Sequence, residues 1–192
     1  MDRYNRPRVA IETELKARVD DPDAVRATLR RLGARLVSAS AFEDNLLLDD
    51  ECGSLFGRGE ALRVRTTGGG SILTWKGPRQ RDRGVRSREE LEVACPDGEG
   101  LVVILERLGF VGVFRYQKYR ETWELEGAEI VLDETPVGHF LEIEAEEPLV
   151  REVVRRLDLP PESVVEESYP TLFRRLLGER GLPPNAMVFD ER

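Results

Sequence analysis

The sequence predicts an α+β domain in which an antiparallel sheet closes, or nearly closes, into a tunnel with a charged interior and helices packed outside. Two observations support this prediction. Charged residues stand at alternate positions in one expected strand after another, with apolar residues between them, and neighbouring side chains of a strand point to opposite faces. Segments with the apolar spacing of helices lie between the strands and can cover the apolar face.

The first strand is expected at residues 9–18, followed by a helix at 22–32. Asp21 suits the N-cap of this helix, Pro22 suits its first position, and Gly33 suits the position after its end. The apolar residues of the segment recur at helical spacing, so they form one stripe that can pack on the sheet.

The same criteria place seven further strands and three further helices. The strands are expected at 45–49, 61–67, 71–77, 88–95, 113–125, 128–133 and 139–146. The helices are expected at 99–108, 148–157 and 169–177. The glycine-rich residues 67–71 and the pair 126–127 are typical of tight turns between strands, and residues 181–185 are expected to be irregular.

Composition excludes several classes of function. The chain has 192 residues, of which 40% are hydrophobic, so it is long enough for one domain with a sizeable core. Its net charge of −8 argues against a nucleic-acid binder. No apolar run reaches the ~20 residues of a membrane span, and the first eight residues lack the apolar core of a signal peptide. We therefore expect a cytoplasmic protein.

The residue types also limit the chemistry of any site. His139 is the only histidine and Cys52 and Cys95 are the only cysteines, which excludes multi-histidine metal sites and four-thiolate zinc sites. A Ser-His-Asp triad is also disfavoured. If the protein is an enzyme, its chemistry must come from carboxylates, lysines and arginines.

For any single strand, the simplest interpretation is an antiparallel sheet with its charged face in water. The repetition of the pattern favours the alternative, in which the sheet closes and the charged face lines the interior. That interior would hold seven acidic and six basic residues. The acidic residues are Glu12, Glu14, Glu90, Glu92, Asp133, Glu142 and Glu144, and the basic residues are Lys16, Arg63, Arg65, Lys76, Lys118 and Arg120.

Such a dense mixture of buried charges costs desolvation energy unless partners satisfy it. Lysine and arginine bind phosphate oxygens, and carboxylates bind hard divalent cations. A highly negative ligand that carries a divalent metal would satisfy both sets. The arginines between Arg79 and Arg88 form a further basic stretch, which we interpret either as a solvated loop or as a lid over such a ligand.

At this point the ordered motifs resemble the CYTH superfamily, whose members are also called triphosphate tunnel metalloenzymes. The resemblance extends over residues 9–178, so the chain is divided into an arm at 1–8, a CYTH-like triphosphate tunnel domain at 9–178 and a tail at 179–192. The motifs are ETELK at 12–16, LRVR at 62–65, LTWKGP at 73–78, REELE at 88–92, KYR at 118–120, LD at 132–133 and GHFLEIE at 138–144.

The resemblance implies an eight-stranded antiparallel tunnel that binds a triphosphate with Mg²⁺ or Mn²⁺. By position, Glu12, Glu14, Glu142 and Glu144 match metal-binding carboxylates. Glu90 and Glu92 match acids near a second metal or the water, and Asp133 matches an acid that assists the metal or the water. The phosphate-binding set is Lys16, Arg63, Arg65, Lys76, Lys118 and Arg120, and the catalytic set is Lys16, Lys76 and Asp133. Leu47 stands where many members carry an aromatic residue.

The resemblance leaves three functions open. One is a metal-dependent triphosphatase that acts on tripolyphosphate, a nucleoside triphosphate such as ATP, or thiamine triphosphate. The second is a class IV adenylyl cyclase that converts ATP to cyclic AMP and pyrophosphate. The third is a non-catalytic module that binds polyphosphate or nucleotide. In each case we expect a small triphosphate partner, no nucleic acid, no membrane, and a monomer or homodimer.

Overall fold

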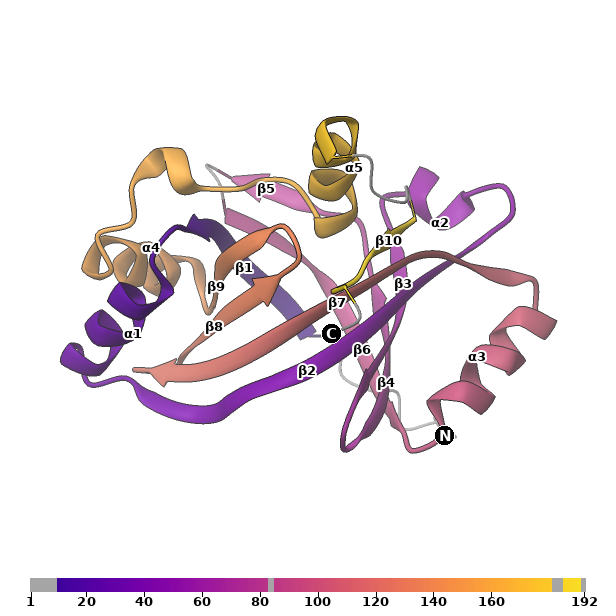
Figure 1. Ribbon diagram of the computed structural model, residues 1–192, viewed down its shortest axis with the longest axis horizontal. Helices are drawn as coiled ribbons and strands as arrows, with labels where there is room; N and C mark the ends of the chain where they lie inside the picture. Colours follow the sequence, from indigo (N-terminus) through magenta and orange to yellow (C-terminus); the bar gives the residue numbers. More distant parts are fainter. Residues whose placement is uncertain (1–9, 83–84, 181–184, 191–192) are drawn as a thin grey trace, which may run out of the picture.

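Eight strands close into a barrel in the computed structural model, which describes residues 10–82, 85–180 and 185–190. Strand β1 (Ala10–Val19) completes the ring, because it pairs with β9 (Gly138–Glu144) on one side and with β6 (Val85–Cys95) on the other (Figure 1). The order around the ring is β1-β9-β8-β7-β2-β3-β4-β6, and every pair in it is antiparallel. The predicted eight-stranded antiparallel tunnel is therefore confirmed.

The other strands of the ring follow the predicted order along the chain. They are β2 (Arg35–Asp50), β3 (Ala61–Thr67), β4 (Gly70–Lys76), β7 (Phe110–Leu125) and β8 (Ala128–Thr135). Two short strands lie outside the ring: β5 (Gln80–Asp82) pairs with β6, and β10 (Ala186–Met187) pairs with β7. The segment expected to be irregular, 181–185, falls almost entirely outside the described residues.

Helices lie outside the barrel or across its end (Figure 1). They are α1 (Pro22–Arg31), α2 (Ser54–Gly57), α3 (Gly98–Arg107), α4 (Glu147–Arg156) and α5 (Tyr169–Arg180), with a 3₁₀ turn at Pro161–Ser163. The Asp21 carboxylate accepts hydrogen bonds from the N–H groups of Asp23 and Ala24, both at 3.0 Å. Gly33 has a φ of +82°, the left-handed conformation that glycine adopts readily. The predicted cap residues of α1 are confirmed.

Three strands begin clearly earlier than predicted. Strand β2 begins at Arg35 rather than at residue 45, β6 begins at Val85 rather than at residue 88, and β7 begins at Phe110 rather than at residue 113. The first half of β2 pairs with β7 through register shifts between Leu36 and Ser38 and between Ser38 and Ala41. A bulge inserts a residue and breaks the two-residue alternation, so the pattern that marks a strand is absent there.

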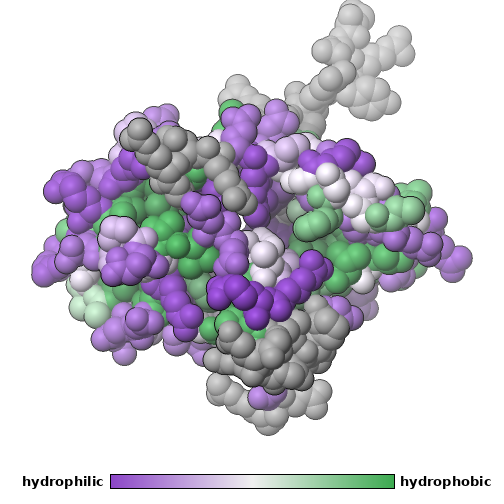
Figure 2. Space-filling model, turned by 90° about the horizontal axis from the view of Figure 1, so that it is seen from above, coloured by the Kyte–Doolittle hydropathy of each residue, from purple (hydrophilic) through white to green (hydrophobic). Residues whose placement is uncertain are grey.

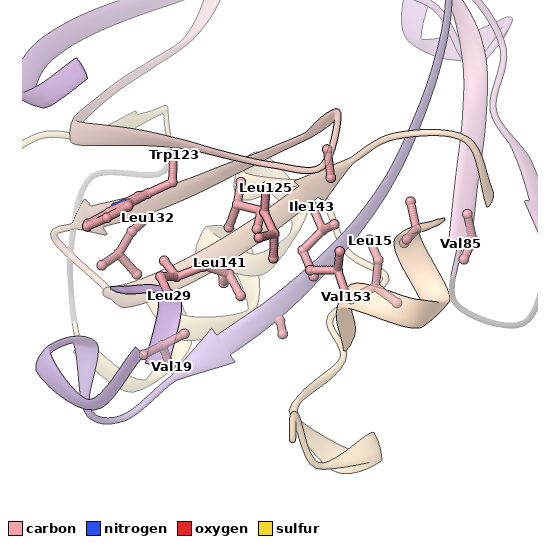
Figure 3. Packing of buried hydrophobic residues seen from close by; sticks show 14 residues of the cluster. Leu15, Val19, Leu29, Val85, Trp123, Leu125, Leu132, Leu141, Ile143 and Val153 are labelled. Atoms are coloured by element: carbon pink, nitrogen blue, oxygen red, sulfur yellow. The ribbon is translucent and has the colours of Figure 1, made fainter. Parts of the chain in front are cut away.

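The apolar side chains pack on the outer surface of the barrel. One cluster joins Leu15 and Ile143 of the strands to Leu29 of α1 and to Val153 of α4 (Figure 3). A second cluster lies beneath α3 and includes Leu105. Because the apolar face is covered from outside, the charged face of every strand is left to line the interior. Among the described residues, every helix is too short or too polar to cross a membrane.

A third cluster covers one end of the barrel. Phe173 of α5 packs against Phe114 of β7, with ring centroids 5.7 Å apart, and Tyr169 of α5 packs edge-on against Phe140 of β9 at 5.4 Å. Phe114 and Phe140 point inward, in phase with the charged residues of their strands. Helix α5 therefore rests on the interior of the barrel rather than on its outer wall.

Candidate functional site

The tunnel interior contains all thirteen charged residues that the sequence places there. Twelve of them line a cavity of about 1410 Å³. The thirteenth, Asp133, lies in the wall of the cavity and is completely buried. The register explains this arrangement, since inward residues of neighbouring strands face one another: Lys16 is opposite Glu142, Lys76 is opposite Glu90, and Arg120 is opposite Asp133. Viewed from above, the surface is hollowed near the centre, where hydrophilic residues predominate (Figure 2).

Three carboxylates converge in one part of the tunnel. One oxygen from each of Glu12, Glu14 and Glu144 lies within 4.8 Å of the others. Burial and the negative charges of Glu142, Glu12 and Glu14 raise the pKa of Glu144 to about 8. The positive charge of Arg120 favours the charged form of Glu144 but does not outweigh these effects, so a further cation nearby would stabilise this carboxylate. The donor set and its electrostatics both fit a hard divalent cation.

Glu12 also belongs to a group of close ion pairs. The Lys76 ammonium lies 2.9 Å from Glu12 and 3.0 Å from Glu90, and the Arg88 guanidinium lies 3.0 Å from Glu12. Burial opposes the charged form of Glu12, but the two cations outweigh burial and lower its pKa. Burial and the hydrogen bond between the two carboxyls raise the pKa of Glu90. Glu90 is therefore the member of the pair that holds a proton more readily, and Glu12 is the member that stays charged.

Asp133 is at the centre of a second group of charges in the tunnel. Its carboxylate accepts hydrogen bonds from Lys118 at 2.9 Å, from Arg120 at 2.8 Å and from the Tyr169 hydroxyl at 2.9 Å. Burial alone would raise the pKa of Asp133, but Arg120 and Lys118 reverse that effect and lower it. Asp133 is thus an anion held among cations.

Glu142 is paired in the same way, with Lys16 at 2.9 Å and with Arg120 at 2.6 Å. Burial favours its neutral form, yet Lys16 and Arg120 hold the pKa of Glu142 well below its usual range. Of the seven acidic residues expected to bind metal, the structure brings Glu12, Glu14 and Glu144 into one cluster. It pairs Glu90, Glu142 and Asp133 with cations.

Arg63 and Arg65 have the longest ion-pair contacts of the basic set. Each lies 3.6 Å from Glu92, and Arg65 lies 3.7 Å from Glu43. The buried Nε of Arg63 has no hydrogen-bond partner within the described part of the chain. Turning these two guanidinium groups towards an anionic ligand would break only long ion-pair contacts, together with the hydrogen bonds that Arg63 donates to the Tyr116 hydroxyl at 3.4 Å and to the Thr74 hydroxyl at 3.2 Å.

Lysine is confined to this site. The sequence contains only three lysines, Lys16, Lys76 and Lys118, and all three line the cavity. Apart from His139, every other basic side chain of the protein is arginine. The ammonium group is a compact point charge on a flexible stem, unlike the planar guanidinium. The tunnel thus combines both kinds of phosphate-binding group.

The sequence patterns missed several residues of the site. Arg86 is almost fully buried and lies 3.1 Å from Glu14, so the end of the basic stretch between Arg79 and Arg88 belongs to the tunnel wall. The alternation that marks Glu90 and Glu92 extends back through Arg88 to Arg86 and could have identified both arginines. Tyr169 carries no such signal, because α5 reaches the tunnel only through tertiary packing.

Comparison with known proteins gives a consistent assignment. The family model described as CYTH domain matches residues 10–169. A protein of Methanocaldococcus jannaschii called "putative adenylate cyclase" is 29% identical over 170 residues, which cover 83% of this chain and 96% of that protein. The chain therefore matches this relative over almost the whole of the relative's length.

Two solved structures share the fold. A Vibrio parahaemolyticus protein described as a "putative adenylate cyclase" has a TM-score of 0.74 at 21% identity, covering 86% of this chain and 99% of that one. A Hippeastrum protein, described as a "putative adenylyl cyclase" with dominant triphosphatase activity, has a TM-score of 0.65 at 22% identity, covering 90% and 98%. At these identities the likeness establishes the tunnel fold.

Proposed function

The chain belongs to the CYTH domain family, and from this premise we propose that it is a divalent-metal-dependent enzyme that binds a triphosphate inside the tunnel and hydrolyses it. The observation that carries the proposal is the closed barrel itself, because closure turns six basic and six acidic residues towards one cavity and places Asp133 in its wall. A polyanion with a divalent cation would satisfy both sets.

The basic residues are arranged for a long anion. They come from four strands: Lys16 from β1, Arg63 and Arg65 from β3, Lys76 from β4, and Lys118 and Arg120 from β7. A single phosphate can contact only part of this set, whereas a triphosphate can contact most of it. Each cation would exchange a carboxylate partner for phosphate oxygens, and charge-assisted hydrogen bonds of this kind are strong.

Glu12, Glu14 and Glu144 would hold the metal, which we propose is Mg²⁺ or Mn²⁺. When bound, such an ion polarises phosphate oxygens and lowers the pKa of coordinated water. The raised pKa of Glu144 means that this carboxyl gains most from a nearby cation. Arg86, at 3.1 Å from Glu14, limits the charge of the cluster and would help to orient that carboxylate.

Phosphoryl transfer depends mostly on positioning and on stabilising charge in the transition state. Lys16 and Lys76 would supply mobile point charges next to the reacting phosphate. Asp133, whose pKa is lowered by Arg120 and Lys118 despite its burial, would act by fixing the directions of those two cations. It is poorly suited to accept a proton, because its charged form is already well satisfied.

A second candidate is a class IV adenylyl cyclase. The observation that favours it is the name of the 29% identical Methanocaldococcus jannaschii relative. In this reaction the ribose 3′-hydroxyl attacks the α-phosphorus and pyrophosphate leaves with its electron pair. The same cations would stabilise the leaving group in the cyclase reaction and in hydrolysis. The two candidate functions therefore differ in how the nucleotide enters the tunnel.

Product analysis separates these activities. The purified protein is incubated with ATP, tripolyphosphate or thiamine triphosphate in the presence of Mg²⁺ or Mn²⁺, and phosphate, pyrophosphate and cyclic AMP are measured. We expect phosphate to be released, and Glu144→Gln to abolish its release while the fold survives. Cyclic AMP with pyrophosphate would instead identify the cyclase. Binding of a triphosphate without any product would identify a non-catalytic polyphosphate-binding module. Absence of binding would refute the proposal.

The cytoplasmic location and the monomeric or homodimeric state that the sequence predicts stay predictions. Sedimentation analysis of the purified chain tests the oligomeric state directly.

A further inference from the structure

Tyr169 stands where α5 meets the tunnel. It is the first residue of the helix, it is 6% exposed, and it lines the cavity. A buried tyrosine hydroxyl usually finds a hydrogen-bond partner. Here the side chain reaches charged residues from three strands of the barrel.

Both parts of the Tyr169 side chain contact charged groups. The hydroxyl donates a hydrogen bond to Asp133 at 2.9 Å. The ammonium of Lys16 lies 3.7 Å from the ring centroid, and the ammonium of Lys118 lies 5.6 Å from it. Cation–π attraction operates at such distances and is strongest where water is excluded. Two of the three lysines of the protein therefore share one aromatic ring.

We propose that Tyr169 is a positioning residue that keeps Asp133 satisfied and the two lysines oriented while the phosphate-binding cations change partners. This inference rests on the proposed function. To hold a triphosphate, Lys118 and Arg120 must turn at least partly from Asp133 towards phosphate oxygens. Asp133 is completely buried, and a buried carboxylate that loses its donors is costly.

The hydroxyl of Tyr169 can keep its hydrogen bond to Asp133, because it comes from α5 and does not belong to the phosphate-binding set. It is neutral, so a polyanion does not draw it away from the carboxylate. Burial and the neighbouring carboxylates of Asp133 and Glu142 raise the pKa of Tyr169 well above its ordinary value, so the hydroxyl keeps its proton. The donor to Asp133 thus persists when the cations move.

The ring has a related effect on Lys16. This ammonium is paired with Glu142 at 2.9 Å, and the ring offers it a second partner on another side. Edge-on packing against Phe140, with ring centroids 5.4 Å apart, fixes the plane of the Tyr169 ring. The position of α5 is thereby coupled to the direction of a phosphate-binding lysine.

The test compares two substitutions. Tyr169→Phe removes only the hydroxyl, and Tyr169→Leu removes the hydroxyl and the ring. Tyr119→Phe is the matched control, because Tyr119 is 37% exposed and packs on the outer wall against Phe42 and Phe189. Tripolyphosphate affinity is measured by calorimetry with Ca²⁺ replacing Mg²⁺ to limit turnover, and kcat and KM are measured separately with Mg²⁺.

For Tyr169→Phe we expect Kd and KM for tripolyphosphate to rise about tenfold or more, the effect of losing one hydrogen bond to a charged group, with kcat nearly unchanged. A merely structural role would lower the active fraction and therefore kcat, and it would leave Kd and KM as they are. Unchanged Kd and KM in Tyr169→Phe would overturn the inference.

A measurement without substrate examines the ring contact. Chains with ¹³C-labelled lysine give signals from only three side chains, which Lys→Arg substitutions assign. We expect the terminal methylene protons of Lys16 to be shifted by the ring current in the wild type and in Tyr169→Phe, and to lose this shift in Tyr169→Leu. An unshifted Lys16 signal in the wild type would overturn the inference while the proposed function stands. Failure of the wild type to bind tripolyphosphate would instead overturn both.

Discussion

Glu144 has the electrostatic environment that most clearly requires a cation. Burial and the carboxylates of Glu142, Glu12 and Glu14 raise its pKa to about 8, above the value of about 4.3 that an unfolded glutamate has. The folded state thus binds a proton more tightly than the unfolded state. The stability that this proton confers is present below the unfolded pKa and is lost as pH rises through about 8.

Glu144→Gln mimics the protonated side chain at every pH. Without metal, we expect its melting temperature to rise relative to that of the wild type as pH increases from 5 to 9. With Mg²⁺, we expect the wild type to have the higher melting temperature, because Mg²⁺ should stabilise only the wild type. Glu106→Gln is the control, because Glu106 is exposed on α3 and is not among the cavity-lining residues. A difference between Glu144→Gln and wild type that does not change with pH would show that the carboxyl is not perturbed.

Arg63 permits a test of anion binding at a single residue. Its contact with Glu92 is long, at 3.6 Å, so substitution disturbs few resident ion pairs. Arg63→Ala should weaken tripolyphosphate binding by about 1.5–3 kcal/mol, the usual range for a hydrogen bond to a charged group. Arg115→Ala, which removes an exposed arginine paired with Asp44 on the outer wall, should leave the affinity unchanged. Equal losses in both variants, measured by calorimetry, would mean that affinity follows overall charge.

At the scale of elements, the two-residue alternation predicted all eight strands of the ring, although it placed the starts of β2, β6 and β7 too late. It placed β3 correctly, and it put Arg63 and Arg65 on the inner face. It failed in the first half of β2, where register shifts disturb the period, and Glu43 was missed for that reason. Contacts made by helices with the tunnel have no periodic signal in the strands, so Tyr169 could not be assigned from the pattern.

Helix α2 presents an aromatic ring to the cavity. Phe56 lines the cavity and is 72% exposed. The buried Asp49 carboxylate accepts hydrogen bonds from the N–H groups of Leu55 at 2.9 Å and of Phe56 at 3.0 Å. Leu55 is anchored in the outer core. The backbone beneath the exposed ring is therefore fixed, and we expect the ring to contact any organic group that a bound triphosphate carries.

Phe56→Ala should accordingly weaken binding of ATP several-fold and leave binding of tripolyphosphate unchanged, because only ATP carries a base that can stack on the ring. Leu108→Ala is the matched control. Leu108 is 70% exposed at the end of α3, and it is not among the cavity-lining residues. Parallel losses for both ligands in titrations of Phe56→Ala would show that α2 supports the tunnel without recognising the organic group.

At the scale of the whole molecule, the barrel contains ion pairs whose basic members can also bind an anionic ligand. Lys16, Lys118 and Arg120 already have carboxylate partners, so a ligand must compete with them, and a single phosphate competes poorly. A ligand that binds only the folded state adds RT ln(1 + [L]/Kd), which is about 2.7 kcal/mol at a hundredfold excess over Kd. For a domain near this size, that corresponds to a rise in melting temperature of roughly 5–10 °C.

The expected thermal-shift series is phosphate, pyrophosphate and then tripolyphosphate, with the largest rise for the longest anion, at fixed Ca²⁺ and constant ionic strength. Length matters because the basic residues come from four strands around the ring, and only a long anion spans them. Constant ionic strength is required because salt screens any contribution from exposed charges. Equal shifts for all three anions would mean that the ligands bind to charges on the surface and do not enter the tunnel. The ion pairs inside the tunnel would then stabilise the barrel without binding a ligand.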